Sequence, residues 1–485
     1  MLRSLTALRV LGMLLMVFSI TYILPIVTSL IYRDGMLADF ALAMVMTLIA
    51  GCLMWLLTYR FKRELSIRNG YLLVVMMWTA MPLFATLPLL LVIDSLSFTD
   101  AYFETMSGMT TTGATTMTGL DNLPPSINLW RHELNWVGGM GIIVLAVAVL
   151  PMLGVGGRQL FKAETPGPMK ESTLTPRITE TARNLWLVYV GITVTCIASL
   201  KMAGMSWLDA ICHAFAAVGL GGFSTHDANV GYFDSPAIEF VLIVFMLLAA
   251  MNFATHFLAW REKNARPYFR DSESMAMLVL ILASCLGIGM FLWGQGTYPA
   301  FWTALRHASF NLVSMATDCG FVSEDFSQWP LFAPLWMLFL SSIAASSGST
   351  GGGIKMVRTM ILFKQAGRDF LRLLHPSAVN PMKIGGAVVA NNIVFSVLSF
   401  IFLYFMSLVT LTFVLVISGL DFITAFSAIL ACINNAGPGL GLVGPASNYG
   451  VLTDFQTWIC TLAMLIGRLE IITLLIIFTP RFWQR

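Results

Sequence analysis

Four segments of this sequence repeat one spacing that ends in a glycine. In each, a dipeptide ending in alanine begins thirteen residues before the glycine, and a short amphipathic, helix-like run lies between them. The glycines are 109, 98 and 117 residues apart along the chain. The four pairs are Asp100-Ala101 with Gly113, Asp209-Ala210 with Gly222, His307-Ala308 with Gly320, and Thr424-Ala425 with Gly437. A spacing repeated four times predicts four copies of one structural unit.

The loops around these glycines have a composition suited to binding a cation. A potassium ion gives up its hydration shell only when carbonyl oxygens replace it, and turning a carbonyl inward often needs dihedrals that mainly glycine adopts. Nearby threonine hydroxyls and asparagine amides add polar groups. We therefore predict a potassium filter of backbone carbonyls, although no full TVGYG run occurs; tight turns without an ion are the alternative. The predicted filter residues are Thr110, Thr111, Thr112, Gly113, Gly219, Leu220, Gly221, Gly222, Thr317, Asp318, Cys319, Gly320, Asn434, Asn435, Ala436 and Gly437.

A run of eight small residues, SSGSTGGG at Ser346–Gly353, interrupts an otherwise helical apolar stretch. Glycine disfavours helix by about 1 kcal/mol per residue, so the stretch should break near the middle of the membrane. We interpret the break as a gate across the pathway, because Lys355 and Arg358 follow directly. A hinge, or close packing of helices on small residues, is the alternative. The predicted gate comprises Gly348, Ser349, Thr350, Gly351, Gly352, Gly353, Lys355 and Arg468.

Arg468 lies inside the last apolar stretch, with Glu470 two residues later. A charge at this depth is expensive, so it normally faces a cavity or a partner. An arginine below a cation filter repels the permeating ion and sets a barrier. A structural arginine, neutralised by a carboxylate or by carbonyls, is an equally favoured interpretation.

Long apolar stretches must position these loops. The chain has 485 residues, of which 57% are hydrophobic and only 11% charged, and about 20 apolar residues suffice to cross a bilayer. We predict an all-α polytopic membrane protein with ten spans, in which residues 5–31 form a retained span rather than a signal peptide. The spans lie near residues 5–31, 36–58, 69–93, 131–153, 183–203, 236–260, 273–293, 331–362, 384–418 and 455–479.

Charge is distributed unevenly between the two sets of connecting segments. One set carries 21 of the 28 Lys and Arg residues and only seven acids: residues 1–9, 59–70, 154–184, 259–272, 363–383 and 480–485. The other set carries 12 acids and one base, Arg306: residues 94–129, 204–236, 294–330 and 418–454. The positive-inside rule places the first set, and both termini, in the cytoplasm. The acidic set then faces outward and concentrates cations at an entrance.

Enzymatic and metal-binding patterns are missing from the sequence. No nucleophile elbow, Walker A loop or dinucleotide fingerprint occurs, so no enzyme is predicted. His132 and Glu133 fit no metal-ligand spacing, and His213 and His256 stand alone in apolar runs, as core histidines do. An ion-coupled secondary transporter is the alternative function, with Glu239 and Glu470 as the nearest intramembrane acids. A non-conducting scaffold does not require four matched glycines.

At its four loops the sequence resembles the Trk/Ktr/HKT superfamily of potassium transporters, and in particular its bacterial TrkH branch. The matching residues are TTTGAT at Thr110–Thr115, GLGGFST at Gly219–Thr225, ATDCGF at Ala316–Phe321 and NNAGPG at Asn434–Gly439. The small-residue break at Ser346–Gly353, Arg468 and the stretch at Phe161–Glu171 also match. The resemblance covers roughly residues 65–485, and the first two spans fit the additional N-terminal pair of that branch.

The resemblance implies a fold and a set of partners. The family fold has four span–pore-helix–span repeats around a central pore, here with two extra N-terminal helices, in a homodimer. The implied units are residues 1–64, 65–156, 157–264, 265–366 and 367–485. Glycine in all four filter positions implies a preference for K+, although Pro438 after Gly437 departs from the other loops.

The family also implies a cellular setting. Its members lie in the bacterial inner membrane, couple to a cytosolic TrkA-like ring of RCK subunits that binds NAD, ATP or ADP, and do not bind nucleic acid. Gating roles in the family carry over to Gly348–Gly353 and Arg468. No cofactor is expected on this chain besides the transported K+, because the nucleotide belongs to the partner.

Overall fold

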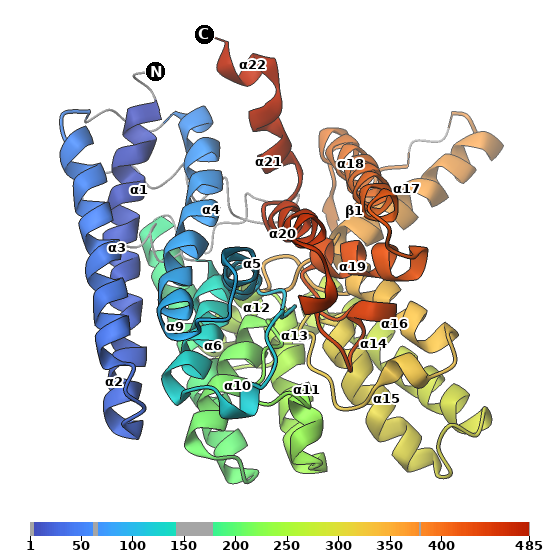
Figure 1. The fold of residues 1–485 in the computed structure, drawn as a ribbon. Coiled ribbons are helices and arrows are strands. Elements are labelled where there is room, and N and C mark those ends of the chain that lie inside the picture. The colour runs from blue at the N-terminus through green and yellow to red at the C-terminus, as the bar shows by residue number, and fades with distance from the viewer. Residues whose placement is uncertain (1–3, 62–65, 142–177, 378–379, 485) are drawn as a thin grey trace.

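The computed structural model describes residues 4–61, 66–141, 178–377 and 380–484, and the chain is mostly helical there (Figure 1). Among these described residues, six helices are long and apolar enough to cross a membrane, and two further pairs qualify if each bent pair counts as one span. The starts of α1 and α22 lie on the same side of the molecule, at the top of Figure 1. Within the described ranges, the only β-structure is a short antiparallel hairpin, β1 (Lys383–Ile384) with β2 (Ala387–Val388), which the sequence did not predict.

The N-terminal helices form a pair beside the rest of the chain (blue in Figure 1). Helix α1 (Ser4–Phe18) continues through η1 (Ser19–Tyr22) into α2 (Ile23–Tyr32), and α3 (Leu37–Thr58) returns alongside. Gly12 and Gly51 allow the close approach, because a Cβ on either would lie within 2.8 Å of the other's carbonyl oxygen. Small residues at such crossings are typical of membrane helices.

Helix α4 (Ile67–Val92) joins this pair to the next elements, α5 (Phe98–Met109) and α6 (Pro125–Met140). Pro88 lacks an N–H and therefore frees the carbonyl of Phe84, which accepts a 2.9 Å hydrogen bond from Tyr22 Oη. The Tyr22 ring stacks on Trp130 with centroids 4.5 Å apart. The short helix η2 (Leu120–Asn122) lies in the loop between α5 and α6.

Three further units repeat the order of long helix, short buried helix and returning helix. The second contains α9 (Ile178–Met202), α10 (Trp207–Gly219), η4 (Asn229–Phe233), α11 (Pro236–Ala250) and α12 (Phe253–Glu262). The third contains α13 (Arg266–Arg270), α14 (Ser272–Gly294), α15 (Phe301–Ala316), η5 (Phe326–Gln328), α16 (Phe332–Ile343) and α17 (Met356–Leu374). The fourth contains α18 (Asn391–Ile417), α19 (Phe422–Asn434), η6 (Gly441–Val443), η7 (Tyr449–Val451), α20 (Asp454–Arg468), α21 (Ile472–Leu475), η8 (Ile476–Phe478) and α22 (Pro480–Trp483).

The returning helices of the second, third and fourth units break, so the described part of the chain has fewer continuous spans than the ten predicted. The predicted break at Ser346–Gly353 is present, between α16 and α17. Two other breaks were not predicted: α11 and α12 meet at 98°, and α20 meets the helix after it at 107°. The predicted span 131–153 begins in α6 and continues outside the described residues. The unit boundary predicted between residues 366 and 367 falls inside α17, whereas those after residues 64 and 156 lie outside the described part.

Candidate functional site

Four short buried helices, α5, α10, α15 and α19, carry the predicted filter loops at their C-terminal ends. Three of them begin at a polar cap, Ser97, Ser206 or Asp421, whose side chain accepts a hydrogen bond of 3.0–3.1 Å from a backbone N–H three residues on. The C-terminal end of a helix carries partial negative charge. The four helices therefore direct negative potential toward the loops that follow them.

The four loops share one backbone conformation. Each helix closes with a 2.8–2.9 Å hydrogen bond from the residue before the glycine to the carbonyl five residues earlier, as in a Schellman motif. Two left-handed positions follow, separated by one residue. The first are Thr111, Leu220, Asp318 and Asn435, with φ of 57°, 55°, 63° and 58°. The second are Gly113, Gly222, Gly320 and Gly437, with φ of 78°, 62°, 86° and 83°. A positive φ at a non-glycine residue costs about 1–3 kcal/mol, so the surrounding packing must hold these turns in place.

Contacts between the loops close a ring. A Cβ added to any of the four glycines would lie within 2.6 Å of the carbonyl oxygen that precedes the glycine of another loop. The pairs run in chain order: Gly113 to the Gly221 carbonyl, Gly222 to that of Cys319, Gly320 to that of Ala436, and Gly437 to that of Thr112. Two separate constraints therefore require glycine at each position: the positive φ angle and the lack of space for a side chain. The ring brings together residues more than 300 positions apart in the sequence.

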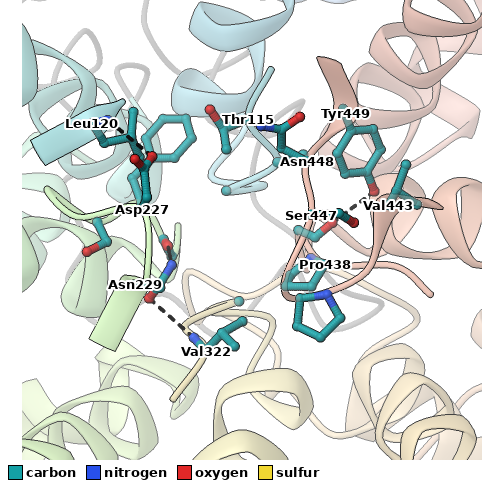
Figure 2. Close-up of a pocket in the computed structure, with 18 of the residues that line it drawn as sticks. Thr115, Leu120, Asp227, Asn229, Val322, Pro438, Val443, Ser447, Asn448 and Tyr449 are labelled. Carbon is teal, nitrogen blue, oxygen red and sulfur yellow. Dashed lines mark hydrogen bonds between the residues drawn. The ribbon is translucent and has the colours of Figure 1, made fainter. Parts of the chain in front are cut away.

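On one side of the ring lies a cavity of about 70 Å³ (Figure 2). All four glycines line it, together with segments that follow each loop. Hydrogen bonds join neighbouring segments around its wall. Asp227 accepts from the backbone N–H groups of Gly119 and Leu120 at 3.0 and 3.1 Å, Asn229 Oδ1 accepts from Val322 N at 3.2 Å, and Tyr449 N donates to the Thr115 carbonyl at 2.8 Å.

A charged cluster ties the first and second loops together at this cavity. His226 Nδ1 lies 2.5 Å from Asp121 Oδ1, and its Nε2 lies 3.5 Å from Asp209 Oδ1. Partial burial disfavours the charged imidazole, but the hydrogen bonds to Asp209 and Asp121 outweigh it and raise the pKa of His226 above its usual 6.5. The hydrogen bond from His226 lowers the pKa of Asp121. Both shifts favour the ionic form of the pair.

The small-residue segment between α16 and α17 lies against the opposite side of the ring. A Cβ on Gly352 would collide with the Asn434 carbonyl, and one on Gly351 would lie 3.0 Å from the Thr317 carbonyl. Gly352 N donates to Asp318 Oδ2 at 3.0 Å, and Thr350 Oγ1 donates to the Val218 carbonyl at 3.2 Å. The segment thus contacts the second, third and fourth loop regions at once.

Arg468 links the same segment to the first loop. Its Nη1 donates to the Thr350 carbonyl at 3.0 Å and to Thr111 Oγ1 at 3.2 Å. Its Nη2 donates to the carbonyls of Gly138 and Gly139, the second at 3.1 Å. The guanidinium also lies over Trp78. Arg468 therefore joins α20, α6, the first loop and the small-residue segment beneath the ring.

The remaining predicted gate residues lie close by. Lys355 is buried, and its ammonium donates to the Gly351 carbonyl. A Cβ on Gly348 would lie 2.8 Å from Asn252 Oδ1, so the breaks of the second and third units meet there. Gly353 approaches the carbonyls of α16, and the Ser349 hydroxyl donates to the Ser346 carbonyl at 2.6 Å. Arg358 pairs with Glu470 at 2.8 Å.

Several polar side chains of the predicted filter serve packing instead of adding groups to the ring. Thr110 and Thr317 donate back to helix carbonyls at 2.7 and 2.8 Å. The Thr112 hydroxyl lies 2.8 Å from that of Thr110 and accepts from Asn435 Nδ2 at 2.9 Å. Asn434 bonds Tyr404, Ser341 and Ser342 on the neighbouring helices. Cys319 and Ala436 contribute carbonyls to the ring.

The lone histidines are core residues, as the sequence predicts. His213 Nδ1 donates to the Asp209 carbonyl at 2.8 Å, and its Nε2 lies 3.0 Å from Ser224 Oγ. His256 bonds Tyr268 Oη and the Leu248 carbonyl, both at 2.8 Å. The stretch at Phe161–Glu171, predicted to be cytoplasmic, lies outside the described residues.

Comparison with known proteins agrees with this geometry. The family model described as TrkH, a cation transport protein, matches residues 37–485. The Trk system potassium uptake protein TrkH of Halomonas elongata is 45% identical over 479 residues, with 99% of each chain covered. That of Escherichia coli strain K12 is 43% identical over 477 residues, with 98% of each covered. The crystal structure of the potassium transporter TrkH from Vibrio parahaemolyticus matches with a TM-score of 0.89 at 41% identity, over 99% of both chains. The chain therefore belongs to the TrkH family of cation transport proteins.

Proposed function

We propose that this chain takes up potassium across a bacterial inner membrane, through a pathway that passes between the four loops. The observation that carries the proposal is the closed ring of glycines and carbonyl oxygens. Carbonyl oxygens at close quarters can replace the hydration shell of K+. The relatives at 43–45% identity are named potassium uptake proteins, which supports K+ as the ion.

The four predicted filter segments, residues 110–113, 219–222, 317–320 and 434–437, supply the coordinating carbonyls in this proposal. Their side chains hold the loops in place from behind. The acidic segments beside the cavity face outward and attract cations. Four span–pore-helix–span units then surround one pore, with both termini in the cytoplasm.

The small-residue segment and Arg468 form the gate in this proposal. They contact all four loop regions from the side opposite the cavity, and the guanidinium puts a positive charge beneath the ring. A positive charge there raises the barrier for a cation. Opening requires the segment to move off the ring, which breaks the hydrogen bond from Gly352 N to Asp318 and the one from Arg468 to the Thr350 carbonyl.

Partners follow from the family. The relatives are named as parts of a Trk system, so we propose that this chain also acts with other components, a cytosolic nucleotide-binding ring among them. A homodimer in the lipid bilayer is the proposed assembly. Exposed basic residues on α13 and α17, such as Arg270 and Arg372, are candidates for the docking surface.

Ion-coupled transport, the alternative, needs a buried acid that changes its protonation. Glu239 binds Arg306 at 2.8 Å and Glu470 binds Arg358 at 2.8 Å. Neither candidate is therefore an isolated buried acid, and their pairing with arginine supports passive conduction over ion coupling in this proposal.

The test is rubidium tracer uptake into liposomes that contain the pure protein, with competing potassium or sodium outside. We expect uptake that potassium blocks and sodium hardly affects, with no need for a proton or sodium gradient. Uptake that appears only with such a gradient supports coupled transport instead. Equal block by both ions contradicts a potassium filter.

A further inference from the structure

One polar side chain on each pore helix lies behind its loop and holds the chain just beyond the filter glycine. Three of them lie nine residues before their glycine and the fourth lies ten before it: Glu104, His213, Asn311 and Ser427. All four are buried. Their positions correspond, but their chemistry differs: carboxylate, imidazole, amide and hydroxyl.

Three of these residues make neutral hydrogen bonds within their own unit. His213 Nε2 lies 3.0 Å from Ser224 Oγ. Asn311 Oδ1 accepts from Ser323 N at 3.1 Å, and Ser427 Oγ accepts from Leu440 N at 2.8 Å. Each contact fixes the backbone two or three residues after the glycine, so it limits how far the glycine can move.

Glu104 also binds the chain just after its glycine, but through a charged carboxylate. Its carboxylate accepts from Thr115 Oγ1 at 2.9 Å and from Thr116 N at 3.1 Å. Arg131 on α6 donates to Glu104 Oε1 through Nε and Nη2, at 2.8 and 2.7 Å. Both side chains are 1% exposed. Desolvation offsets much of the attraction within a buried ion pair, so such a pair adds little net stability. A role other than stabilising the fold is therefore needed to explain this pair.

Arg131 also reaches the second loop. Its Nη1 donates to the Ser224 carbonyl at 3.3 Å, and its guanidinium lies 4.4 Å from the centre of the Phe223 ring. Phe223 and Ser224 directly follow Gly222. The pair therefore fixes the chain after Gly113 and after Gly222 together, and those two glycines are neighbours in the ring.

We propose that Glu104 and Arg131 are positioning residues that set the spacing between the first and second filter loops, and thereby the preference for K+ over Na+. The inference rests on the proposed filter. Selectivity depends on the number and placement of the coordinating carbonyls. Loosening one side of the ring lets its carbonyls close around the smaller sodium ion.

The test removes both charges at once, since removing one leaves the other buried and unpaired. The double variant Glu104→Met with Arg131→Met keeps the volume and loses the links to both loops. The matched control is Glu239→Met with Arg306→Met, which removes another arginine–glutamate pair, buried at the glutamate and partly exposed at the arginine, whose ionic contacts are to each other and to Asp234. Rubidium uptake with competing potassium or sodium is measured on variants that elute as a single species and melt cooperatively.

We expect the Glu104/Arg131 variant to lose potassium preference on the order of tenfold, equivalent to about 1.4 kcal/mol, whereas the Glu239/Arg306 variant keeps the wild-type preference. A folded Glu104/Arg131 variant with wild-type preference overturns the inference. If that variant does not fold, Thr115→Val removes a hydroxyl that binds Glu104 and leaves the ion pair intact. A smaller loss of preference then supports the inference, and no loss overturns it.

Gly113→Ser, measured in parallel, separates this inference from the function on which it rests. A loss of preference in Gly113→Ser, but not in the charge-pair variant, rejects the positioning role and leaves the filter in place. No change in either variant rejects the filter itself.

Discussion

The two sides of the glycine ring are in contact with different parts of the chain. On the cavity side, hydrogen bonds between the side chains of Asp227 and Asn229 and the backbone of the neighbouring segments join the wall into one structure. On the opposite side, the segment between α16 and α17 and the Arg468 side chain press directly on the loops. A wall joined by hydrogen bonds suits a surface that must keep its dimensions, whereas a glycine-rich segment and one long side chain suit a part that must move. We therefore propose selection on the first side and closure on the second.

The largest effect is expected from Gly113→Ser. Its φ of 78° and the adjacent Gly221 carbonyl both exclude a side chain, so the ring must open locally. We expect potassium preference to fall by about tenfold or more, the equivalent of at least about 1.4 kcal/mol, in rubidium uptake with competing ions. Gly119→Ser is the matched control: Gly119 also has positive φ, at 73°, but a side chain there meets open space. Equal loss in both variants would show that strain in the loop, not the ring contact, causes the change.

Arg468→Ala tests the closed side. Hydrogen bonds from a charged donor contribute about 1.5–3 kcal/mol each, and Arg468 makes four to the first loop, to α6 and to the small-residue segment. We expect basal rubidium uptake without any partner to rise on the order of tenfold. The control is Arg368→Ala, a buried arginine on α17 that binds Asn391. Unchanged uptake in a folded Arg468→Ala variant would make this arginine a structural link only.

Gly352→Ala should displace the small-residue segment from the ring by less than Arg468→Ala does. The added methyl group collides with the Asn434 carbonyl, so the segment must shift, whereas the Arg468 side chain stays in place with its bonds to Thr111 and α6. We expect basal uptake to rise by about threefold. Gly367→Ala on α17 meets open space and should leave uptake unchanged. A fall in uptake with Gly352→Ala would argue that this segment supports the ring instead of closing it.

The smallest effect concerns pH. His226 has a raised folded pKa, so the stability it contributes is fully present below its unfolded value of about 6.5 and is lost as pH rises through the raised value. Asp121 has a lowered pKa, so its contribution is lost only as pH falls through that lowered value. We expect the melting temperature of the wild type to fall by a few degrees as pH rises above 6.5. His226→Gln should flatten this slope; an unchanged slope would exclude His226 as its source.

The four glycines and the break at Ser346–Gly353 could be predicted because they leave composition signals. The left-handed residues two positions before the glycines could not, since Thr111, Leu220, Asp318 and Asn435 share no chemistry. The breaks after Ala250 and Arg468 have no proline beside them, and each broken pair is still apolar enough to pass for one span. These two breaks depend on tertiary packing, which the local sequence does not reveal.

The contacts of the side chains near the filter could not be predicted from the sequence either. Thr110 follows a helix end, where its hydroxyl reaches the carbonyl four residues earlier, so a local bond competes with any ion. The Glu104–Arg131 pair is separated by 27 residues, and neither residue type alone distinguishes a buried pair from a solvated charge. Such contacts depend on how α5 docks against α6.

The most direct test of separate selection and closure is a comparison of Gly113→Ser, Arg468→Ala and the combined variant in one rubidium uptake assay. Independent elements predict that Arg468→Ala raises the rate at unchanged potassium preference, that Gly113→Ser lowers the preference, and that the combined variant shows both changes. Loss of potassium preference in Arg468→Ala alone would contradict this division, because the same element would then both close the pathway and select the ion.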